Sequence, residues 1–327
     1  MIILNDKCYG LEVFLKEYFS NPKDIKNGTE MCFTDFDDAL INVKVLENKD
    51  LVIEISWSCA KDFLSNGSKD VIEKVYAGHN LLFGENGFTI VVKAESIPSD
   101  DAAKDELIAK LSLIKRHLFS GPFIAIMEGD AASVSKLKPL QIQLKPGEYM
   151  WIIPNTDKSF TCGFSNTVGD KTDLPIAKVM YHEFDATRTQ TALSSCPTAI
   201  SSEGCPKDIE QFDFRRIGID GYFLFTVHPR HYSPPGMKER IIAQLMLFRP
   251  YLDYHFKCAK AFTHYRMRTC HDNLVQVLNR AKGEIKMGRG TKTFSGRNMV
   301  PKRGLYLKWL KIILYERLTF RNKFYLK

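Results

Sequence analysis

The sequence predicts an α+β protein in which two similar α/β domains pack together and are followed by a long C-terminal α-helix. Its length of 327 residues is enough for two domains of ordinary size. Residues 1–236 mix strand-like apolar runs with helical segments, whereas residues 237–282 keep a helical periodicity throughout. Apolar residues make up 44% of the chain and charged residues 26%, which is typical of globular proteins and excludes a largely disordered chain.

We expect the N-terminal α/β domain to cover residues 1–122. A helix is predicted over residues 10–19, because apolar residues recur there at helical spacing, at Leu11, Phe14, Leu15 and Tyr18. Strands are predicted at residues 31–36, 39–46, 50–57 and 88–94. Two more helical segments are predicted, at residues 59–78 with a break at Asn66-Gly67, and at residues 101–119 with a stop at Gly121-Pro122.

The second α/β domain is expected over residues 123–282, in contact with the first because no Gly/Ser-rich linker separates them. Its strands are predicted at residues 140–144, 148–154, 159–164, 176–184 and 221–229. The segment from Thr187 to Arg216 is rich in Ser, Thr, Pro and Cys, and we expect a long ordered loop there. Residues 283–327 are expected to form a basic, flexible tail.

The long helix is predicted over residues 237–282 from an apolar stripe. Its eleven members recur every 3.6 residues on average, namely Ile241, Leu245, Phe248, Leu252, Phe256, Ala259, Thr263, Met267, Cys270, Leu274 and Val277. Such a helix is about 70 Å long, which is too long for one small domain to cover. We therefore expect much of the stripe to pack on another chain. Pro250 predicts either a kink or a helix that begins near it.

The net charge of +8 combines two regions of opposite sign. Residues 238–327 contain 21 Lys and Arg against 5 Asp and Glu, a net charge of +16, whereas residues 1–237 carry a net charge of −8. Charge asymmetry of this size usually marks a partner surface. We expect an acidic partner for the C-terminal region, and nucleic acid, anionic lipid and an acidic protein polymer all fit.

The sequence also predicts a cytoplasmic protein. The first ten residues lack a basic segment and include Asp6, so no signal peptide is expected. The apolar run at residues 312–315 is far shorter than the roughly 20 residues that span a bilayer. The eight cysteines are sparse and irregularly spaced, and we interpret them as reduced thiols.

One motif raises the hypothesis of an enzyme. FTDFDDAL at residues 33–40 is an apolar strand followed by Asp-x-Asp, the pattern with which haloacid-dehalogenase phosphatases begin, with Asp35 as nucleophile and Asp37 as acid and base. However, Ala39 stands where Thr or Val is expected, and Val134 stands where the later metal motif needs Asp. A turn in which a carboxylate caps local backbone groups is the favoured interpretation.

Other candidate sites are weaker. Residues 283–293 resemble a phosphate-binding loop but have Arg289 and Gly290 where Lys and Ser or Thr are required. Several residues could bind a metal, namely His228, His231, His255, Cys258, His264, Cys270 and His271, yet their spacing does not make a zinc site. We interpret them as core thiols and hydrogen-bonded histidines, and expect neither metal nor cofactor. Cys196 and Cys205 could be matched with a histidine as a protease dyad, but nothing in the sequence supports it.

Basic residues on the long helix are the stronger signal. They are Lys257, Lys260, His264, Arg266, Arg268, Arg280 and Lys282, with few carboxylates nearby. A solvated helix face is one interpretation, and binding to an acidic partner is the other. Nucleic acid is not expected as that partner, because no recognisable nucleic-acid-binding fold accompanies the patch.

Seven segments, in order along the chain, resemble the subunit 2 (34-kDa subunit) family of the actin-related protein 2/3 complex. They are FTDFDDAL (33–40), LIKRHLFSGPF (113–123), KVMYHEFDATR (178–188), YFLFTVHPRH (222–231), YLDYHFKCAKAFTHYRMR (251–268), VLNRAKGE (277–284) and KTFSGR (292–297). The resemblance implies two similar α/β domains, a long C-terminal helix and no enzymatic activity. It gives Asp35 and Asp37 a structural role.

The resemblance also implies partners. In that family the subunit pairs through its long helix with subunit 4, holds the actin-related subunits and contacts the side of an actin filament in the cytoplasm. Our candidate residues for contact with the filament or a partner are Lys257, Lys260, Arg266, Arg268 and Arg280.

Two features depart from the family pattern. Pro250 lies where the family usually continues its helix, and residues 298–327 extend beyond the usual end of the family. This last segment carries eight Lys and Arg residues and one acidic residue, and it includes Trp309, Ile312 and Ile313. Binding to a lipid membrane, to nucleic acid or to a partner is one hypothesis for it, and a lineage-specific tail without an essential role is the favoured one.

Overall fold

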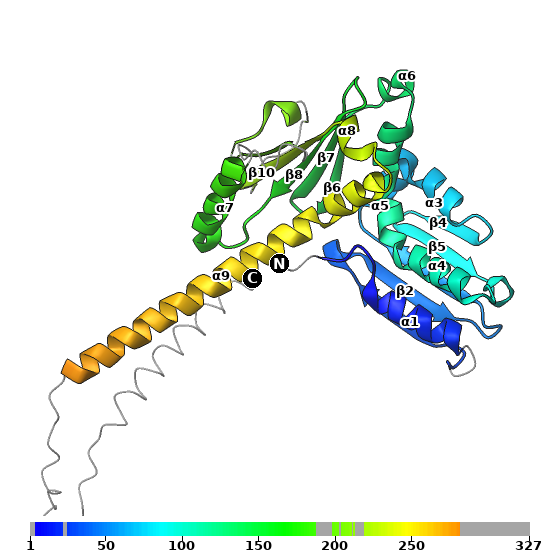
Figure 1. The fold of residues 1–327 in the computed structure, drawn as a ribbon, viewed down its shortest axis with the longest axis horizontal. Coiled ribbons are helices and arrows are strands. Elements are labelled where there is room, and N and C mark those ends of the chain that lie inside the picture. Colours follow the sequence, from blue (N-terminus) through cyan, green and yellow to red (C-terminus); the bar gives the residue numbers. More distant parts are fainter. Residues whose placement is uncertain are drawn as a thin grey trace, which may run out of the picture. The chain divides into compact units, whose positions relative to one another are not determined.

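The structure is a computed structural model that describes residues 4–21, 25–187, 198–202, 204–210, 212 and 219–281 (Figure 1). The chain divides into two units, residues 1–264 and 265–327. In the described part of the first unit, ten strands form two five-stranded antiparallel sheets, with helices between and after them. The predicted fold class is confirmed, including the long C-terminal helix α9 (Met237–Ala281).

The first sheet has the strand order β1-β2-β3-β5-β4. Its strands are β1 (Glu30–Thr34), β2 (Leu40–Val45), β3 (Leu51–Ser56), β4 (Asn80–Gly84) and β5 (Gly87–Val92). Strand β3 buries alternate residues, as its sequence predicts, because Leu51, Ile53 and Ile55 face the core. The short strand β4 was not predicted. It lies at the edge of the sheet, and Leu82 on it is exposed.

Helices accompany this sheet. They are α1 (Tyr9–Ser20), α2 (Ala60–Phe63), α3 (Lys69–Val75), α4 (Asp101–Ser112) and α5 (Ile114–Glu128). The predicted helix at residues 10–19 is confirmed, and its apolar residues Leu11, Leu15 and Tyr18 are fully buried. The break predicted at Asn66-Gly67 is also present, where Gly67 has a φ of +95° between α2 and α3.

The predicted stop at Gly121-Pro122 is wrong, because helix α5 continues through both residues. Pro122 has no N–H to donate to the carbonyl of Leu118. The hydroxyl of Ser68 donates to that carbonyl instead, over 2.6 Å. Gly121 allows this approach, since a Cβ there would lie 2.2 Å from the backbone nitrogen of Ser68.

The second sheet has the order β6-β7-β8-β10-β9. Its strands are β6 (Leu140–Lys145), β7 (Glu148–Pro154), β8 (Phe160–Asn166), β9 (Thr198–Ser202) and β10 (Gly221–Val227). Short helices α6 (Ala131–Val134) and α8 (Pro229–Tyr232) flank it in the sequence. Strand β9 lies inside the segment that was expected to be a loop, so that expectation is wrong for residues 198–202.

The strand predicted at residues 176–184 is wrong, because the chain forms helix α7 (Leu174–Thr187) there. In a strand, residues 177, 179 and 181 would share one face. In the structure Ala177 and Tyr181 are buried while Val179 is 62% exposed, which is a helical pattern. Tyr181 and Phe184 each pack edge-on against Phe223 of the second sheet.

One apolar core includes residues of both sheets and the first part of α9. From α9 it takes Ile241, Ile242, Leu245 and Met246. The helix passes through Pro250 and begins at Met237, so the predicted start near Pro250 is wrong. Among the described helices, none combines the length and the hydropathy that crossing a bilayer requires.

Candidate interaction site on the long helix

The site begins with the loop that carries the motif FTDFDDAL. Asp35 accepts a hydrogen bond from the backbone N–H of Phe36, and a short helix follows over Phe36–Asp38. Asp37 and Asp38 have φ angles of 60° and 59°, in the left-handed region that non-glycine residues seldom adopt. Because Asp tolerates this conformation better than most residues, the sequence suits the turn. The indole N–H of Trp57 donates to the Asp37 carbonyl over 3.0 Å.

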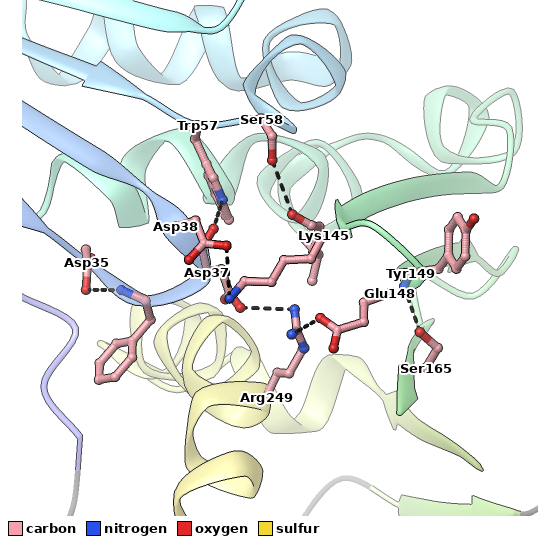
Figure 2. A network of polar contacts seen from close by, with 12 residues as sticks. Asp35, Asp37, Asp38, Trp57, Ser58, Lys145, Glu148, Tyr149, Ser165 and Arg249 are labelled. Atoms are coloured by element: carbon pink, nitrogen blue, oxygen red, sulfur yellow. Dashed lines mark hydrogen bonds and ion pairs between the residues drawn. The ribbon is translucent and has the colours of Figure 1, made fainter. Parts of the chain in front are cut away.

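The three aspartates of this loop each pair with a cation from a different element, and Figure 2 shows two of these pairs. The pairs are Asp35 with Lys115 of α5 (3.6 Å), Asp37 with Arg249 of α9 (3.0 Å) and Asp38 with Lys145 of β6 (3.2 Å). We call these six residues the aspartate clamp. It joins the loop between β1 and β2 to α5, to the second sheet and to the first part of α9.

Arg249 is the most enclosed cation of the clamp after Lys115. Its side chain is 7% exposed, as is that of Asp37. Its guanidinium also forms an ion pair with Glu148 of β7, so it binds one carboxylate from the loop before β2 and one from the second sheet (Figure 2). Removing one partner of such a buried pair typically costs about 3–5 kcal/mol, because the other charge is left unpaired.

Lys115 illustrates the cost of burying a charge. Its side chain is 2% exposed, and burial lowers the pKa of its ammonium group, an effect that the nearby charges of Asp35 and Asp37 oppose. The ammonium group donates to the carbonyl of Phe36 over 2.5 Å and lies 5.2 Å from the centre of the Trp57 ring. It therefore holds the loop by a hydrogen bond, an ion pair and a cation–π contact.

This geometry fits the capping interpretation of the motif. The carboxylates of Asp35 and Asp37 are engaged by cations and backbone groups of the chain itself. Across the described residues, no group of three or more His, Cys, Asp or Glu side chains is arranged to hold a metal ion.

Sequence reasoning missed Lys115, Lys145, Glu148 and Arg249. A signal for Arg249 was present, since it is a charged residue within the apolar segment at residues 241–252, next to Pro250. Lys145 reaches Asp38, and Glu148 reaches Arg249, only because the turn between β6 and β7 lies beside them, which no local pattern reveals.

The five predicted contact residues all lie on α9, in different environments. Lys257 is exposed, and so are Arg266, Arg268 and Arg280. Lys260 is partly covered, and its ammonium group lies 2.5 Å from Asp173, whose side chain is 10% exposed. This hydrogen bond raises the pKa of Lys260 and attaches α9 to the segment before α7.

The basic residues follow two sides of α9. At about 100° per residue, Lys257, Lys260, His264 and Arg268, which are spaced by three, four and four residues, share one side. Arg266 is about 160° around the helix from Arg268, and Arg280 lies near the angle of Arg266. The apolar stripe lies between these two basic sides.

The apolar stripe changes environment along the helix. Ile241, Leu245 and Leu252 are buried within the first unit. From Thr263 onward every described member is exposed, and Met267, Leu274 and Val277 are 65%, 57% and 58% exposed. We call residues 263–281 the helix extension. A contiguous apolar face of this kind typically marks a contact with another chain.

The structure corrects the interpretation of two candidate metal ligands, the cysteines of α9. Cys258 and Cys270 are exposed rather than core thiols, because the helix carries them away from the apolar stripe or beyond its covered part. The interpretation of hydrogen-bonded histidines is confirmed at His231, whose Nδ1 accepts from the backbone N–H of His228 over 3.0 Å. Burial lowers the pKa of His231, so its ring stays neutral as that acceptor.

Several predictions lie outside the described residues. They concern the loop at residues 283–293, Lys282, Cys196 and the segment 298–327.

Two antiparallel sheets, joined by the aspartate clamp to a long helix with exposed apolar residues, define the class as an α+β protein with a long C-terminal helix. A family model described as the Arp2/3 complex 34 kD subunit p34-Arc matches residues 53–285. The chain is 31% identical over 272 residues to actin-related protein 2/3 complex subunit 2 of Dictyostelium discoideum, which covers 82% of this chain and 88% of that protein. It is 28% identical over 310 residues to the protein of the same name from Schizosaccharomyces pombe, covering 88% and 95%. The chain belongs to the p34-Arc family, and the family predicted from its motifs is confirmed.

Proposed function

We propose that this chain is a non-catalytic scaffold subunit of an actin-related protein 2/3 complex. The exposed apolar stripe of the helix extension carries the proposal, because a helix of this kind needs a partner to cover it. Family membership supports the assignment to the complex. In this proposal residues 1–122 and 123–282 are the two domains of the scaffold, and residues 283–327 are a basic tail without an essential role.

Subunit 4 of the same complex is the proposed partner of the helix extension. Burying a large apolar side chain contributes about 1.5–3 kcal/mol. Met267, Leu274 and Val277 would therefore supply several kcal/mol on association. The scaffold would also hold the actin-related subunits, and it would act in the cytoplasm at the actin cytoskeleton.

The side of an actin filament is the proposed acidic partner of the basic residues. Lys257 and Arg268 are the leading candidates on one side of α9, and Arg266 and Arg280 on the other. Lys260 is the weakest candidate, because a filament would compete with Asp173 for its ammonium group. Each charge-assisted hydrogen bond would contribute about 1.5–3 kcal/mol and would weaken with added salt.

Co-expression with a subunit 4 homologue tests the pairing. We expect the wild-type chain to co-purify with subunit 4, and Met267→Asp with Leu274→Asp to abolish co-purification, because both carboxylates would be buried in the interface. Gln276→Asp with Asn279→Asp is the matched control, since both residues are exposed and lie roughly opposite the stripe. Equal loss in the control, or none in the stripe variant, would contradict the proposed pairing.

Charge reversal tests the filament contact. In assembled complexes, we expect Lys257→Glu with Arg268→Glu, or Arg266→Glu with Arg280→Glu, to weaken co-sedimentation with filaments and to flatten its dependence on salt. The control is Lys74→Glu with Lys138→Glu, which makes the same change of charge at exposed positions away from α9. Unchanged co-sedimentation and branching in both α9 variants would remove this assignment.

A further inference from the structure

The structure assigns a role to Arg249 that goes beyond the proposed pairing and filament contacts. We propose that Arg249 is a positioning residue, which fixes the first part of α9 against both sheets and so sets the direction in which the helix meets its partners. That Arg249 fixes the position of α9 is inferred from the contacts of Arg249 alone. That it thereby sets the direction in which the helix meets its partners rests on the proposed function.

The contacts of Arg249 link three separate parts of the fold. Arg249 belongs to α9, Asp37 to the loop before β2, and Glu148 to the start of β7. A guanidinium is planar and presents several N–H donors in a fixed fork, so it can bind two carboxylates in a defined geometry. Lysine is a single point charge on a flexible stem and does not fix both partners in the same way. The residue type therefore suits a joint between three elements.

The position of Arg249 in the helix adds a second reason. Pro250 follows it directly and removes the backbone hydrogen bond that its N–H would have given to the carbonyl of Met246. The helix is thus weakened locally at the turn where the clamp binds it. A side-chain joint at this turn restrains the helix where its own backbone restrains it least.

A contribution to the stability of the fold does not by itself explain why Arg249, Asp37 and Glu148 are kept as a largely buried group of charges. Buried ion pairs can often be replaced by apolar residues without loss of stability, because the pair must be taken out of water. The clamp also includes two residues with left-handed backbone conformations, Asp37 and Asp38. Such conformations cost free energy and persist only where the surrounding contacts hold them in place. The buried charges can instead hold the three elements that carry them in one defined arrangement.

The experiment compares three variants of the full-length chain. Arg249→Met removes the fork and leaves Asp37 and Glu148 unpaired. The triple variant Asp37→Asn, Glu148→Gln and Arg249→Met removes the fork together with the charges of both carboxylates that it binds, so the test remains possible if the first variant unfolds. Lys238→Met is the matched control, because Lys238 is also on α9 and pairs with Glu128 of α5 at the surface.

The first readout is the distance between spin labels on non-canonical amino acids at positions 74 in α3 and 258 in α9, both exposed and both within the first unit. We expect one narrow distance distribution for the wild type and the control, and a broadened or shifted one for the triple variant. A triple variant with the wild-type distribution would overturn the proposal. This readout does not depend on actin or on any partner.

The second readout is branch formation by assembled complexes at equal subunit occupancy. We expect the triple variant to be incorporated normally and yet to form fewer branches than the wild type. Wild-type branching by the triple variant would show that Arg249 only balances charge, and would overturn the second half of the proposal. If the wild-type chain itself supports no branching, the proposed function fails, while the label distances still decide whether Arg249 positions α9.

Discussion

His117 lies in α5 and is partly buried, and its Nδ1 is 2.8 Å from the hydroxyl of Tyr76. That hydroxyl donates to the carbonyl of Lys110 over 3.0 Å, so the Nδ1 of a neutral ring is the donor to Tyr76. Burial is the main cause that lowers the pKa of His117 to about 4, and the charges of Arg116 and Lys110 add to it. The folded protein therefore keeps this ring neutral at pH values where an unfolded chain protonates it.

This pKa shift predicts a loss of stability in acid. The unfolded histidine titrates near pH 6.5, so between about pH 6.5 and pH 4 the unfolded state binds more protons than the folded state. The free energy of unfolding should fall as the pH falls through this window, by about 3 kcal/mol in total from this residue.

Urea unfolding of the wild type and of His117→Asn at a series of pH values measures this effect. Asparagine can keep the donor toward Tyr76 but does not titrate. The difference in free energy of unfolding between the two proteins should be constant above pH 7 and should shift in favour of the variant toward pH 4. A difference that does not vary with pH would contradict the assignment.

At the scale of elements, helix α5 depends on a residue from a different segment. Its Pro122 leaves the carbonyl of Leu118 without a helical partner, and the Ser68 hydroxyl from the turn before α3 replaces that donor. Ser68 is fully buried, so water does not substitute for it. The continuation of α5 is therefore decided by a contact about 50 residues away in the sequence.

Ser68→Ala should destabilise the protein by about 1–3 kcal/mol, because it leaves the Leu118 carbonyl buried without a hydrogen bond. Ser65→Ala is the matched control, since the Ser65 hydroxyl bonds to the Lys61 carbonyl at an exposed position. Thermal unfolding of both variants checks this, and equal midpoints for the two would show that the Ser68 bond contributes nothing.

At the scale of the whole molecule, the described apolar residues of the two units differ in how they are covered. In the first unit one core includes both sheets and the first turns of α9. In the helix extension the described apolar residues are exposed, including Leu274 and Leu278. Stability should therefore be unequal along a single helix, since local opening is easiest where buried contacts are few.

Hydrogen exchange measures this inequality. In the isolated chain, the backbone amides of residues 265–281 should exchange faster than those of residues 241–252 of the same helix. Association with subunit 4 should slow exchange in the extension and leave residues 241–252 little changed. Equal protection of both segments in the isolated chain would contradict the exposure of the stripe.

The sequence by itself determined the fold class, the family, most strands and the long helix. Strand β3 and helix α1 could be predicted because each buries one face. A buried face requires apolar residues at every second position of a strand or at helical spacing, and this pattern can be seen in the local sequence. The basic residues and the apolar stripe of α9 were visible for the same reason. Periodicity failed at residues 176–184, where a short apolar run fits a strand or a helix equally well until its neighbours are known.

Two features were determined only by the tertiary structure. One is the continuation of helix α5 through Pro122, and the other is the set of residues that bind the aspartates of the FTDFDDAL motif. Ser68 and Leu118, and Asp37 and Arg249, are distant in the sequence, and hydrogen bonds and ion pairs between such residues leave no periodic trace in it. The same motif fits a catalytic loop or a structural turn. Which of the two it forms depends on the charges that surround it, and those come from α5, α9 and the second sheet.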